Sequence, residues 1–257
     1  MAVDEAILEA VGAGRVPPTL RLYAWTPACL SLGYAQPAAD AALDALTARG
    51  WQVVRRLTGG RAILHTDEIT YSVCGPQDEP RLAGGVLESY RRLAEALLRT
   101  LDLLGLPAEA LEKPQPVTSS PARQQNPVCF EVPSNYEITA GGRKLLGSAQ
   151  ARRKEGVLQH GSLPLHGDLT RVVQALAFAD EPARKVAAER LLQRAVTAEG
   201  AGGRVIAWDE TALAFEQGFR EALNLGFDRL ALTDAELARA DELARDKYAS
   251  WEWTGRI

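Results

Sequence analysis

Three strand-like segments follow one another between residues 135 and 165, with only short turns between them. They read NYEITA, RKLLGSAQARR and GVLQHGSLPL. The first turn contains Gly141-Gly142, and the second contains Lys154-Glu155-Gly156. Both are typical of β-hairpins, because glycine readily adopts the positive φ angles of tight turns. The segment therefore predicts a three-stranded antiparallel meander.

The rest of the sequence mixes strand-like and helix-like patterns. Further strands are predicted over residues 18–25, 28–35, 51–56 and 69–74, and helices over 3–11, 36–50, 86–104, 168–178, 181–196, 209–224 and 233–248. The last helix begins with a capping box, Thr233 to Glu236. Residues 112–128 are rich in proline, serine and glutamine, which predicts a long mobile loop. We expect an α+β fold with a largely antiparallel central sheet flanked by helices.

Composition limits the classes of protein to which the chain can belong. Its 257 residues, 46% of them hydrophobic, are enough to bury a full core. No apolar run approaches the roughly 20 residues of a membrane span, and acidic residues stand where a signal peptide would be basic. The net charge of −4 argues against a general nucleic-acid-binding protein. These features predict a cytoplasmic protein that binds neither nucleic acid nor membrane.

The stretch RRLTGGRAILH, residues 55–65, is more elaborate than a simple turn requires. Adjacent Gly59 and Gly60 lack Cβ atoms, so a ligand can approach the backbone closely. The flanking arginines suit a carboxylate, a phosphate or a thioester oxygen. The pattern is neither a Walker loop nor a GxGxxG motif. Taken alone, the two glycines are more often a hairpin turn, and His65 is more often a structural histidine.

Lys144 lies in the middle of the predicted strand 143–152, which is unusual because burying an unpaired ammonium is costly. Strict alternation places it on one face with Leu146, Ser148 and Gln150. The spacing leaves two interpretations open. Either the lysine points to solvent from an edge strand, or it faces a pocket and stabilises a developing oxyanion.

The three cysteines, Cys29, Cys74 and Cys129, are widely scattered and show no metal-ligand spacing. We expect reduced thiols and no metal site. Cys29 and Cys74 lie in apolar strands and should fill core space. Cys129 stands between the polar loop and the meander. On position alone it is more often a buried thiol than a nucleophile, which would need a nearby cation to lower its pKa.

Taken together, these segments resemble the superfamily of lipoate–protein ligase A, biotin ligases and octanoyltransferases. Its three signature blocks are matched by RRLTGGRAILH, NYEITAGGRKLLGSAQARR and GVLQHGSLPL, and its N-terminal blocks by MAVDEAILEA and LRLYAWTPACLSLGYAQ. The resemblance extends over nearly the whole chain, so it is more specific than any single motif. One departure is that the family usually has another strand before the helix with which this chain begins.

The resemblance implies a single catalytic domain of the biotin and lipoate ligase type over residues 1–257, with a helical C-terminal portion over about 168–250. Its cleft would hold an acyl chain, with the arginine–glycine loop along the chain and Lys144 at the carbonyl end. The residues implied to bind the acyl substrate are Arg55, Arg56, Thr58, Gly59, Gly60, Arg61, His65, Gly147, Ser148, Ala149, Gln150, His160 and Gly161.

Three features resemble the LipM type of octanoyltransferase more than an ATP-dependent lipoate–protein ligase. Arg61 follows the two glycines where ligases commonly have a third, and VCFEVPSNYEI places Cys129 where this type has its acyl-accepting cysteine. The chain also stops soon after KYASWEW, with no room for the accessory domain that ligases often carry. The alternatives are a ligase acting through lipoyl-AMP, with a separate accessory chain, and an amidotransferase that moves octanoyl or lipoyl between lipoyl domains.

The resemblance implies acyl transfer in two steps, with Cys129 and Lys144 as the catalytic residues. The Cys129 thiolate attacks octanoyl–acyl carrier protein, and a lysine of a lipoyl domain, such as the glycine-cleavage H protein, then attacks the enzyme thioester. Thioester exchange is nearly isoenergetic and amide formation is downhill, so no cofactor is expected; ATP and magnesium belong only to the ligase alternative. Lys144 binds the carbonyl oxygen or helps to deprotonate an attacking group.

Both protein substrates must dock over the same cleft in turn. Because carrier proteins are acidic, the basic residues 152–154 or the Arg55–Arg56 pair are candidates for steering them. The simpler interpretation of residues 152–154 is a solvated hairpin tip. A function of a different class, a non-catalytic module that binds acyl groups or carrier proteins, is disfavoured by the thiol and the lysine of the implied site.

Overall fold

The computed structural model describes residues 1–112 and 136–257 of the chain. Its centre is a six-stranded sheet with the strand order β1-β5-β9-β8-β7-β6. The strands are β1 (Thr19–Tyr23), β5 (Glu68–Gly75), β6 (Ala108–Glu112), β7 (Tyr136–Ala140), β8 (Arg143–Arg153) and β9 (Gly156–Pro164). All neighbouring pairs in this order are antiparallel. This confirms the predicted α+β fold with an antiparallel central sheet.

The predicted meander is formed by β7, β8 and β9. Gly141 and Gly142, at its first turn, have φ angles of 54° and 72°, as a hairpin turn matched to the strand twist requires. At the second turn Gly156 has a φ angle of 144°, and a Cβ atom there would lie 2.4 Å from the carbonyl oxygen of Gly75. The glycines therefore fix both reversals of the chain.

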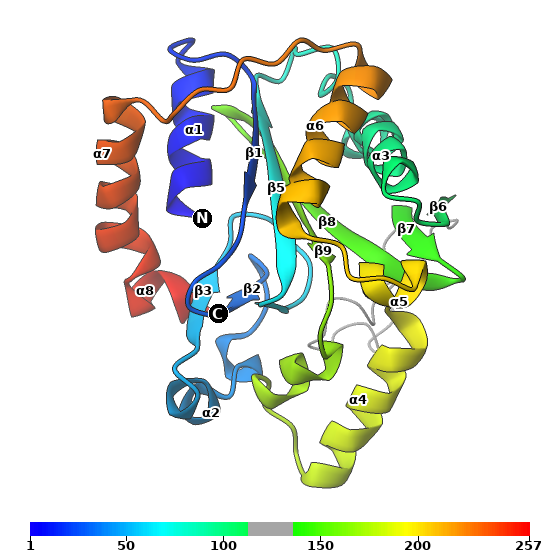
Figure 1. The fold of residues 1–257 in the computed structure, drawn as a ribbon. Coiled ribbons are helices and arrows are strands. Elements are labelled where there is room, and N and C mark those ends of the chain that lie inside the picture. Colours follow the sequence, from blue (N-terminus) through cyan, green and yellow to red (C-terminus); the bar gives the residue numbers. More distant parts are fainter. Residues whose placement is uncertain (113–135) are drawn as a thin grey trace.

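A second, smaller sheet contains β2 (Cys29–Leu32), β3 (Gln52–Arg55) and β4 (Ile63–His65), in the order β3-β2-β4. β2 runs parallel to β3 and antiparallel to β4. The predicted strands 18–25 and 28–35 therefore belong to different sheets. The arginine–glycine loop connects β3 to β4 across the end of β2, which brings it beside the large sheet (Figure 1).

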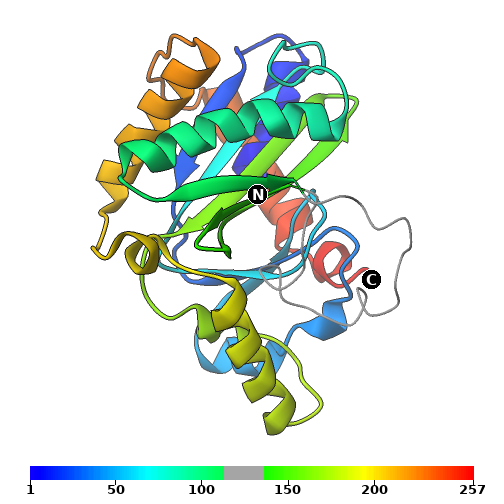
Figure 2. The ribbon, with the colours of Figure 1, turned by 90° about the vertical axis from the view of Figure 1, so that its right-hand side faces the viewer.

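Helices cover both faces of the large sheet (Figures 1 and 2). On one face lie α3 (Val86–Leu103) and α6 (Trp208–Leu223), and on the other lie α1 (Ala2–Gly12) and α7 (Asp234–Leu243). The remaining helical elements are α2 (Leu43–Ala48), α4 (Glu181–Arg194), α5 (Ala198–Gly202), α8 (Trp251–Thr254), the 3₁₀ helices Ala38–Asp40 and Leu169–Gln174, and the π-helix Ala244–Tyr248. None of the helices in the described ranges has the length and apolar character to cross a membrane.

Two predicted helices are shorter than expected, for one shared reason. Residues 36–50 form a 3₁₀ turn followed by α2, and residues 168–178 form only a 3₁₀ helix. Ala41 and Leu176 pair in an antiparallel bridge between the two segments. A backbone that is extended for such a bridge cannot continue a helical ladder. The pairing of the two segments therefore ends both helices.

The strand β6 is missing from the sequence prediction. Its residues, Ala, Glu and Leu, are strong helix formers, but they pair with β7 along their whole length, beginning with Ala108 opposite Ala140. Tertiary pairing overrides the local preference here. The predicted mobile loop over 112–128 lies, beyond Glu112, outside the described residues.

Candidate active site

A small pocket lies between the two sheets. It is lined by Met1, Ser31, Arg56, Gly60, Ile63, His65, Thr70, Gly147, Ser148, Ala149, His160, Gly161 and Ser162. Several predicted acyl-binding residues meet in this lining: Arg56, Gly60, His65, Gly147, Ser148, Ala149, His160 and Gly161. The other predicted ones, Arg55, Thr58, Gly59, Arg61 and Gln150, are not part of it. Binding of an acyl group by any of them stays a prediction.

Arg56 gives the arginine–glycine loop its shape. The side chain is buried, and its guanidinium donates to the carbonyl oxygens of Ser31 (2.8 Å), Gly59 (3.0 Å) and Arg61 (2.7 Å). Gly60 has a φ angle of 92°, which favours glycine. The loop is therefore more than a hairpin turn, because it is wrapped around an arginine that also lines the pocket.

Arg55 is fully buried and binds backbone on two sides. Its guanidinium donates to the carbonyl oxygens of Gly33, Tyr34, Gln36 and Thr254 at distances of 2.6 to 3.1 Å. The Thr254 carbonyl comes from α8, so the C-terminal helix anchors the start of the loop. The prediction that Arg55 and Arg56 steer a partner protein is wrong, because neither guanidinium reaches the surface.

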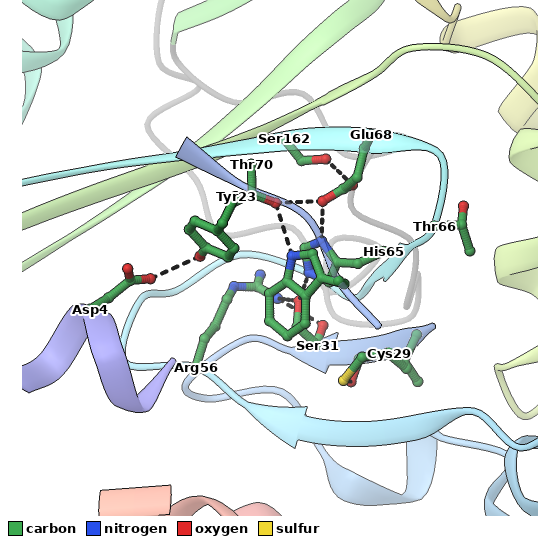
Figure 3. A network of polar contacts seen from close by, with 12 residues as sticks. Asp4, Tyr23, Cys29, Ser31, Arg56, His65, Thr66, Glu68, Thr70 and Ser162 are labelled. Carbon is green, nitrogen blue, oxygen red and sulfur yellow. Dashed lines mark hydrogen bonds and ion pairs between the residues drawn. The ribbon is translucent and has the colours of Figure 1, made fainter. Parts of the chain in front are cut away.

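A buried hydrogen-bond network centres on Glu68, at the start of β5 (Figure 3). Its Oε1 lies 2.6 Å from His65 Nδ1 and accepts a hydrogen bond of 2.5 Å from Thr70, while the Ser162 hydroxyl donates to Oε2. Across the imidazole, Nε2 lies 2.8 Å from the Ser31 hydroxyl. The carboxylate at Nδ1 and the hydroxyl at Nε2 together fix the orientation of the ring.

The environment of Glu68 keeps its carboxylate ionised. Burial alone raises the pKa of such a group, but His65 beside it and the hydroxyls of Ser162 and Thr70 hold the pKa of Glu68 below its ordinary value. Trp25 stacks on the imidazole with ring centroids 4.2 Å apart and donates its indole N–H to Thr70 over 2.9 Å. His65 is thus the hydrogen-bonded structural histidine of the simpler interpretation, and it also lines the pocket.

His160 and Thr58 form a second buried pair. The Thr58 hydroxyl lies 2.6 Å from His160 Nε2, and both residues are buried. Burial lowers the pKa of His160 to about 3, so the imidazole is uncharged at neutral pH. Its Nδ1 has no hydrogen-bond partner among the described residues. Because Thr58 belongs to the arginine–glycine loop and His160 to β9, the pair joins the two sheets.

A β-bulge changes the predicted face of Lys144. Thr139 in β7 pairs with Lys144, whereas the preceding Ile138 pairs with Leu146, so Leu145 is an extra residue in β8. Neighbouring residues of β7 face opposite sides of the sheet. Lys144 and Leu146 therefore lie on opposite faces, and the prediction that they share one is wrong.

The bulge places Lys144 on the pocket side of the sheet. It shares this face with Gly147 and Ala149, which line the pocket, and not with Gln150, as strict alternation would require. Gln150 lies on the opposite face, where its amide donates to Gln159 over 2.9 Å. Gln150 is therefore a poor candidate for substrate contact.

Lys144 is buried and faces a carboxylate. Its ammonium lies 3.5 Å from Oε1 of Glu137 in β7, and only 6% of each residue's surface is exposed. The interpretation of a solvent-facing lysine on an edge strand is wrong. The two side chains thus form a buried ion pair. Sequence reasoning missed Glu137. The signal that could have found it is its position in the meander, two residues before Thr139, which pairs with Lys144.

The cysteines fall into two groups. Cys29 and Cys74 are free and buried, as predicted. Burial raises the pKa of the Cys29 thiol to about 12, which rules it out as a thiolate nucleophile near neutral pH. Cys129, the predicted nucleophile, lies outside the described residues, and its role stays a prediction. Elsewhere in the chain, no three His, Cys, Asp or Glu residues of the described ranges converge as a metal site requires.

The basic residues of the β8–β9 turn differ from one another. Arg152 donates to the carbonyl oxygen of Leu82 over 2.6 Å, and the Arg153 guanidinium lies 5.0 Å from the ring centroid of Tyr34. Lys154 is the most exposed of the three, with 91% of its side chain exposed, and its ammonium lies 3.6 Å from the carboxylate of Glu155. The turn is therefore largely a solvated hairpin tip. That its basic residues steer a partner protein stays a prediction.

Comparison with known proteins agrees with this geometry. Octanoyltransferase LipM of Brevibacillus brevis is 42% identical over 261 residues, which cover 100% of this chain and 94% of the relative. Octanoyltransferase LipM of an Exiguobacterium species is 42% identical, with coverage of 98% and 92%.

Solved structures show the same fold. The bipartite lipoate protein ligase of Thermoplasma acidophilum, described with its E2 lipoyl domain, is 28% identical with a TM-score of 0.78, and the match covers 100% of this chain and 91% of that one. A lipoate–protein ligase A bound with ATP is also 28% identical, with a TM-score of 0.78 and coverage of 100% and 93%. The family model of the lipoyl protein ligase A/B catalytic domain matches residues 1–220. The chain therefore belongs to the lipoyl protein ligase A/B catalytic-domain family, as the sequence predicted.

Proposed function

We propose that the protein is an octanoyltransferase of lipoate biosynthesis, which moves an octanoyl group from acyl carrier protein to a lysine of a lipoyl domain. The observation that carries the proposal is the buried ammonium of Lys144, on the same sheet face as a largely apolar pocket. A fatty acyl thioester has one polar end and one apolar tail, and this arrangement matches both. The octanoyltransferase relatives, at 42% identity, support the same activity.

The pocket must widen to accept an acyl chain. It encloses about 40 Å³, which is little more than the volume of one water molecule in the liquid, about 30 Å³. Its lining comes from two separate sheets. A small displacement of the lining side chains, of the kind seen when proteins rearrange on binding, opens a channel along β8 between Lys144 and the Thr58–His160 pair.

In the first step the Cys129 thiolate attacks the thioester carbonyl of octanoyl–acyl carrier protein. The carbonyl oxygen gains negative charge, the bond to the carrier's thiol breaks, and that thiolate leaves and takes up a proton. In the second step a lysine amine of the lipoyl domain attacks the Cys129 thioester, loses a proton, and releases the cysteine as a thiol. No step consumes ATP, because the thioester already carries the activated acyl group.

In this scheme Lys144 binds the developing oxyanion and does not act as a base. Its ammonium forms an ion pair with a buried carboxylate 3.5 Å away, and an ammonium has no lone pair with which to accept a proton. Glu137 acts through Lys144 and is a positioning residue. The same positive charge favours a cysteine thiolate near it.

A second candidate activity is ATP-dependent lipoate–protein ligation. The similar structures are ligases, one of them bound with ATP, and their TM-score of 0.78 supports this alternative. The lipoyl domain named with the Thermoplasma enzyme also supports a lipoyl domain as the acceptor in this chain. The glycine-cleavage H protein is the acceptor that we propose.

Intact-mass spectrometry separates these activities. The protein is incubated with octanoyl–carrier protein and no ATP, and we expect an adduct of about 126 Da, the mass of octanoyl replacing hydrogen. Addition of H protein should discharge the adduct and octanoylate the H protein. The Cys129→Ser variant, which keeps the size of the side chain, should show neither event. Modification of H protein only with ATP and free acid would establish the ligase instead.

A further inference from the structure

The pocket follows β8 and β9 away from Lys144. Gly147 and Ala149 line it from β8, and their partners Ser162 and His160 line it from β9. We propose that His160, held in place by its hydrogen bond with Thr58, is the end stop of this pocket and limits the acyl chain to about eight carbons. The inference rests on the proposed function, because it assumes that an acyl chain enters with its carbonyl at Lys144.

The bulge and Glu137 determine where the carbonyl end of the acyl chain is held. Glu137 lies two residues before Thr139, the partner of Lys144, and therefore on the same sheet face and closer to Gly147. Because the ammonium pairs with Glu137, the lysine side chain leans along β8 toward Gly147. The polar end of the substrate is thus held near the residue at which the pocket begins.

The far end lies about one octanoyl length away. Gly147 and Ala149 are two residues apart, or about 7 Å at ~3.4 Å per strand residue. Ala149 stands directly opposite His160, so the ring closes the pocket about 7 Å beyond Gly147. An extended octanoyl group spans about 9 Å from carbonyl carbon to methyl carbon, at roughly 1.3 Å per zigzag bond, so its carbonyl carbon lies about 2 Å before Gly147, on the side of Lys144. Two more methylenes add about 2.5 Å on the same scale, which brings the chain into the imidazole.

The stop is built to resist a longer chain. Thr58 and His160 are both buried, and their hydrogen bond of 2.6 Å holds the ring between the sheets. Thr58 is itself fixed by the loop that Arg56 shapes through the carbonyls of Gly59 and Arg61. The low pKa of His160 keeps the ring uncharged, so an apolar methyl group can lie against it without separating a charge from solvent.

The test is competition between acyl–carrier proteins of six, eight, ten and twelve carbons, read as relative kcat/KM. His160→Ala removes the stop, and we expect the decanoyl-to-octanoyl ratio to rise about tenfold, since one methylene in a fitted pocket is worth about 10- to 200-fold. Ala149→Leu shortens the pocket from the opposite wall, and the hexanoyl-to-octanoyl ratio should rise by about the same factor. Gln150→Ala, one residue along on the other face, is the matched control and should leave both ratios unchanged.

The outcomes distinguish the end stop from the activity itself. Unchanged ratios in both variants, with octanoyl transfer retained, would overturn the end stop and leave the proposed function standing. Failure of the unaltered protein to transfer any acyl group would overturn the proposed function, and with it the end stop. A preference shifted to longer acyl chains in His160→Ala and to shorter acyl chains in Ala149→Leu supports the proposal. Should His160→Ala fail to fold, as judged by thermal unfolding, the Ala149→Leu result decides alone.

Discussion

The loop arginines and Lys144 are all buried cations, yet their surroundings differ in kind. Arg55 and Arg56 direct their guanidinium groups at backbone carbonyls from several segments. Lys144 instead faces the carboxylate of Glu137, beside the pocket. Several carbonyl oxygens hold a planar guanidinium in one orientation, whereas a single carboxylate balances the charge of an ammonium. The arginines therefore shape the site, and the lysine is the cation that can respond to charge on a substrate.

Removing the lysine should give the largest loss of activity. Lys144→Met takes away the proposed oxyanion donor, and we expect octanoyl transfer to fall about 10²- to 10³-fold, as when one such donor is lost. The variant also removes the ammonium that faces the buried carboxylate of Glu137, so its thermal stability should fall.

A double variant separates these two effects. Lys144→Met with Glu137→Gln removes both charges of the buried pair and should recover part of the stability without recovering activity. Thermal unfolding and single-turnover transfer, measured on the same samples, check both parts. Recovery of transfer in the double variant would show that the lysine is needed only for folding.

Removing the first loop arginine should act mainly on stability. Arg55→Met removes the hydrogen bonds to the carbonyls of Gly33, Tyr34, Gln36 and Thr254, and we expect the free energy of unfolding to fall by about 3–5 kcal/mol. Arg55→Lys should not restore it, because one ammonium cannot span carbonyls on both sides. Urea unfolding measures the loss. A fully stable Arg55→Met protein with the hundredfold defect of Lys144→Met would reverse the assignment of roles.

His160 extends the comparison to a buried group that stays neutral. Its pKa is about 3 in the folded protein and about 6.5 in an unfolded chain. Between these values the unfolded state binds one more proton, so stability is complete above about pH 6.5 and is lost as the pH falls, at up to about 1.4 kcal/mol per pH unit. His160→Asn should remove this component from a series of urea titrations between pH 7 and 4. The same slope in the variant would assign it to other groups.

An exposed arginine supplies the reference for all of these effects. Arg99 pairs with Glu221 between α3 and α6, and 40% of each side chain is exposed. Solvent screens such pairs, so Arg99→Ala should cost less than about 1 kcal/mol and leave transfer unchanged. A cost close to that of Arg55→Met would mean that burial does not explain the importance of the loop arginine.

The meander and the family were predictable because they depend on local signals. Alternating strands and paired glycines identify β7 to β9 without knowledge of the rest of the chain, and the signature stretches identify the superfamily. The long helix α3 was predictable for the same reason, since its apolar positions repeat at helical spacing.

The face of Lys144 and the burial of Arg55 were not predictable in this way. A single extra residue, Leu145, reverses the face of the lysine, and no composition rule marks a bulge in advance. The Thr254 carbonyl that binds Arg55 lies 199 residues further along the chain. The sequence gives only a weak signal for the network around Glu68: an acidic residue three positions after His65 is a reasonable hydrogen-bond partner for that histidine.

The contact between Arg55 and α8 bears on where the functional unit ends. The family model stops at residue 220, but the Thr254 carbonyl and the Trp253 indole N–H, which donates to the Arg55 carbonyl over 2.8 Å, come from the segment after it. A fragment that ends at residue 220 would keep every signature residue. It would lose the hydrogen bonds by which Trp253 and Thr254 hold Arg55. For expression, tagging or domain exchange, the short helix α8 belongs to the site as much as the glycines do.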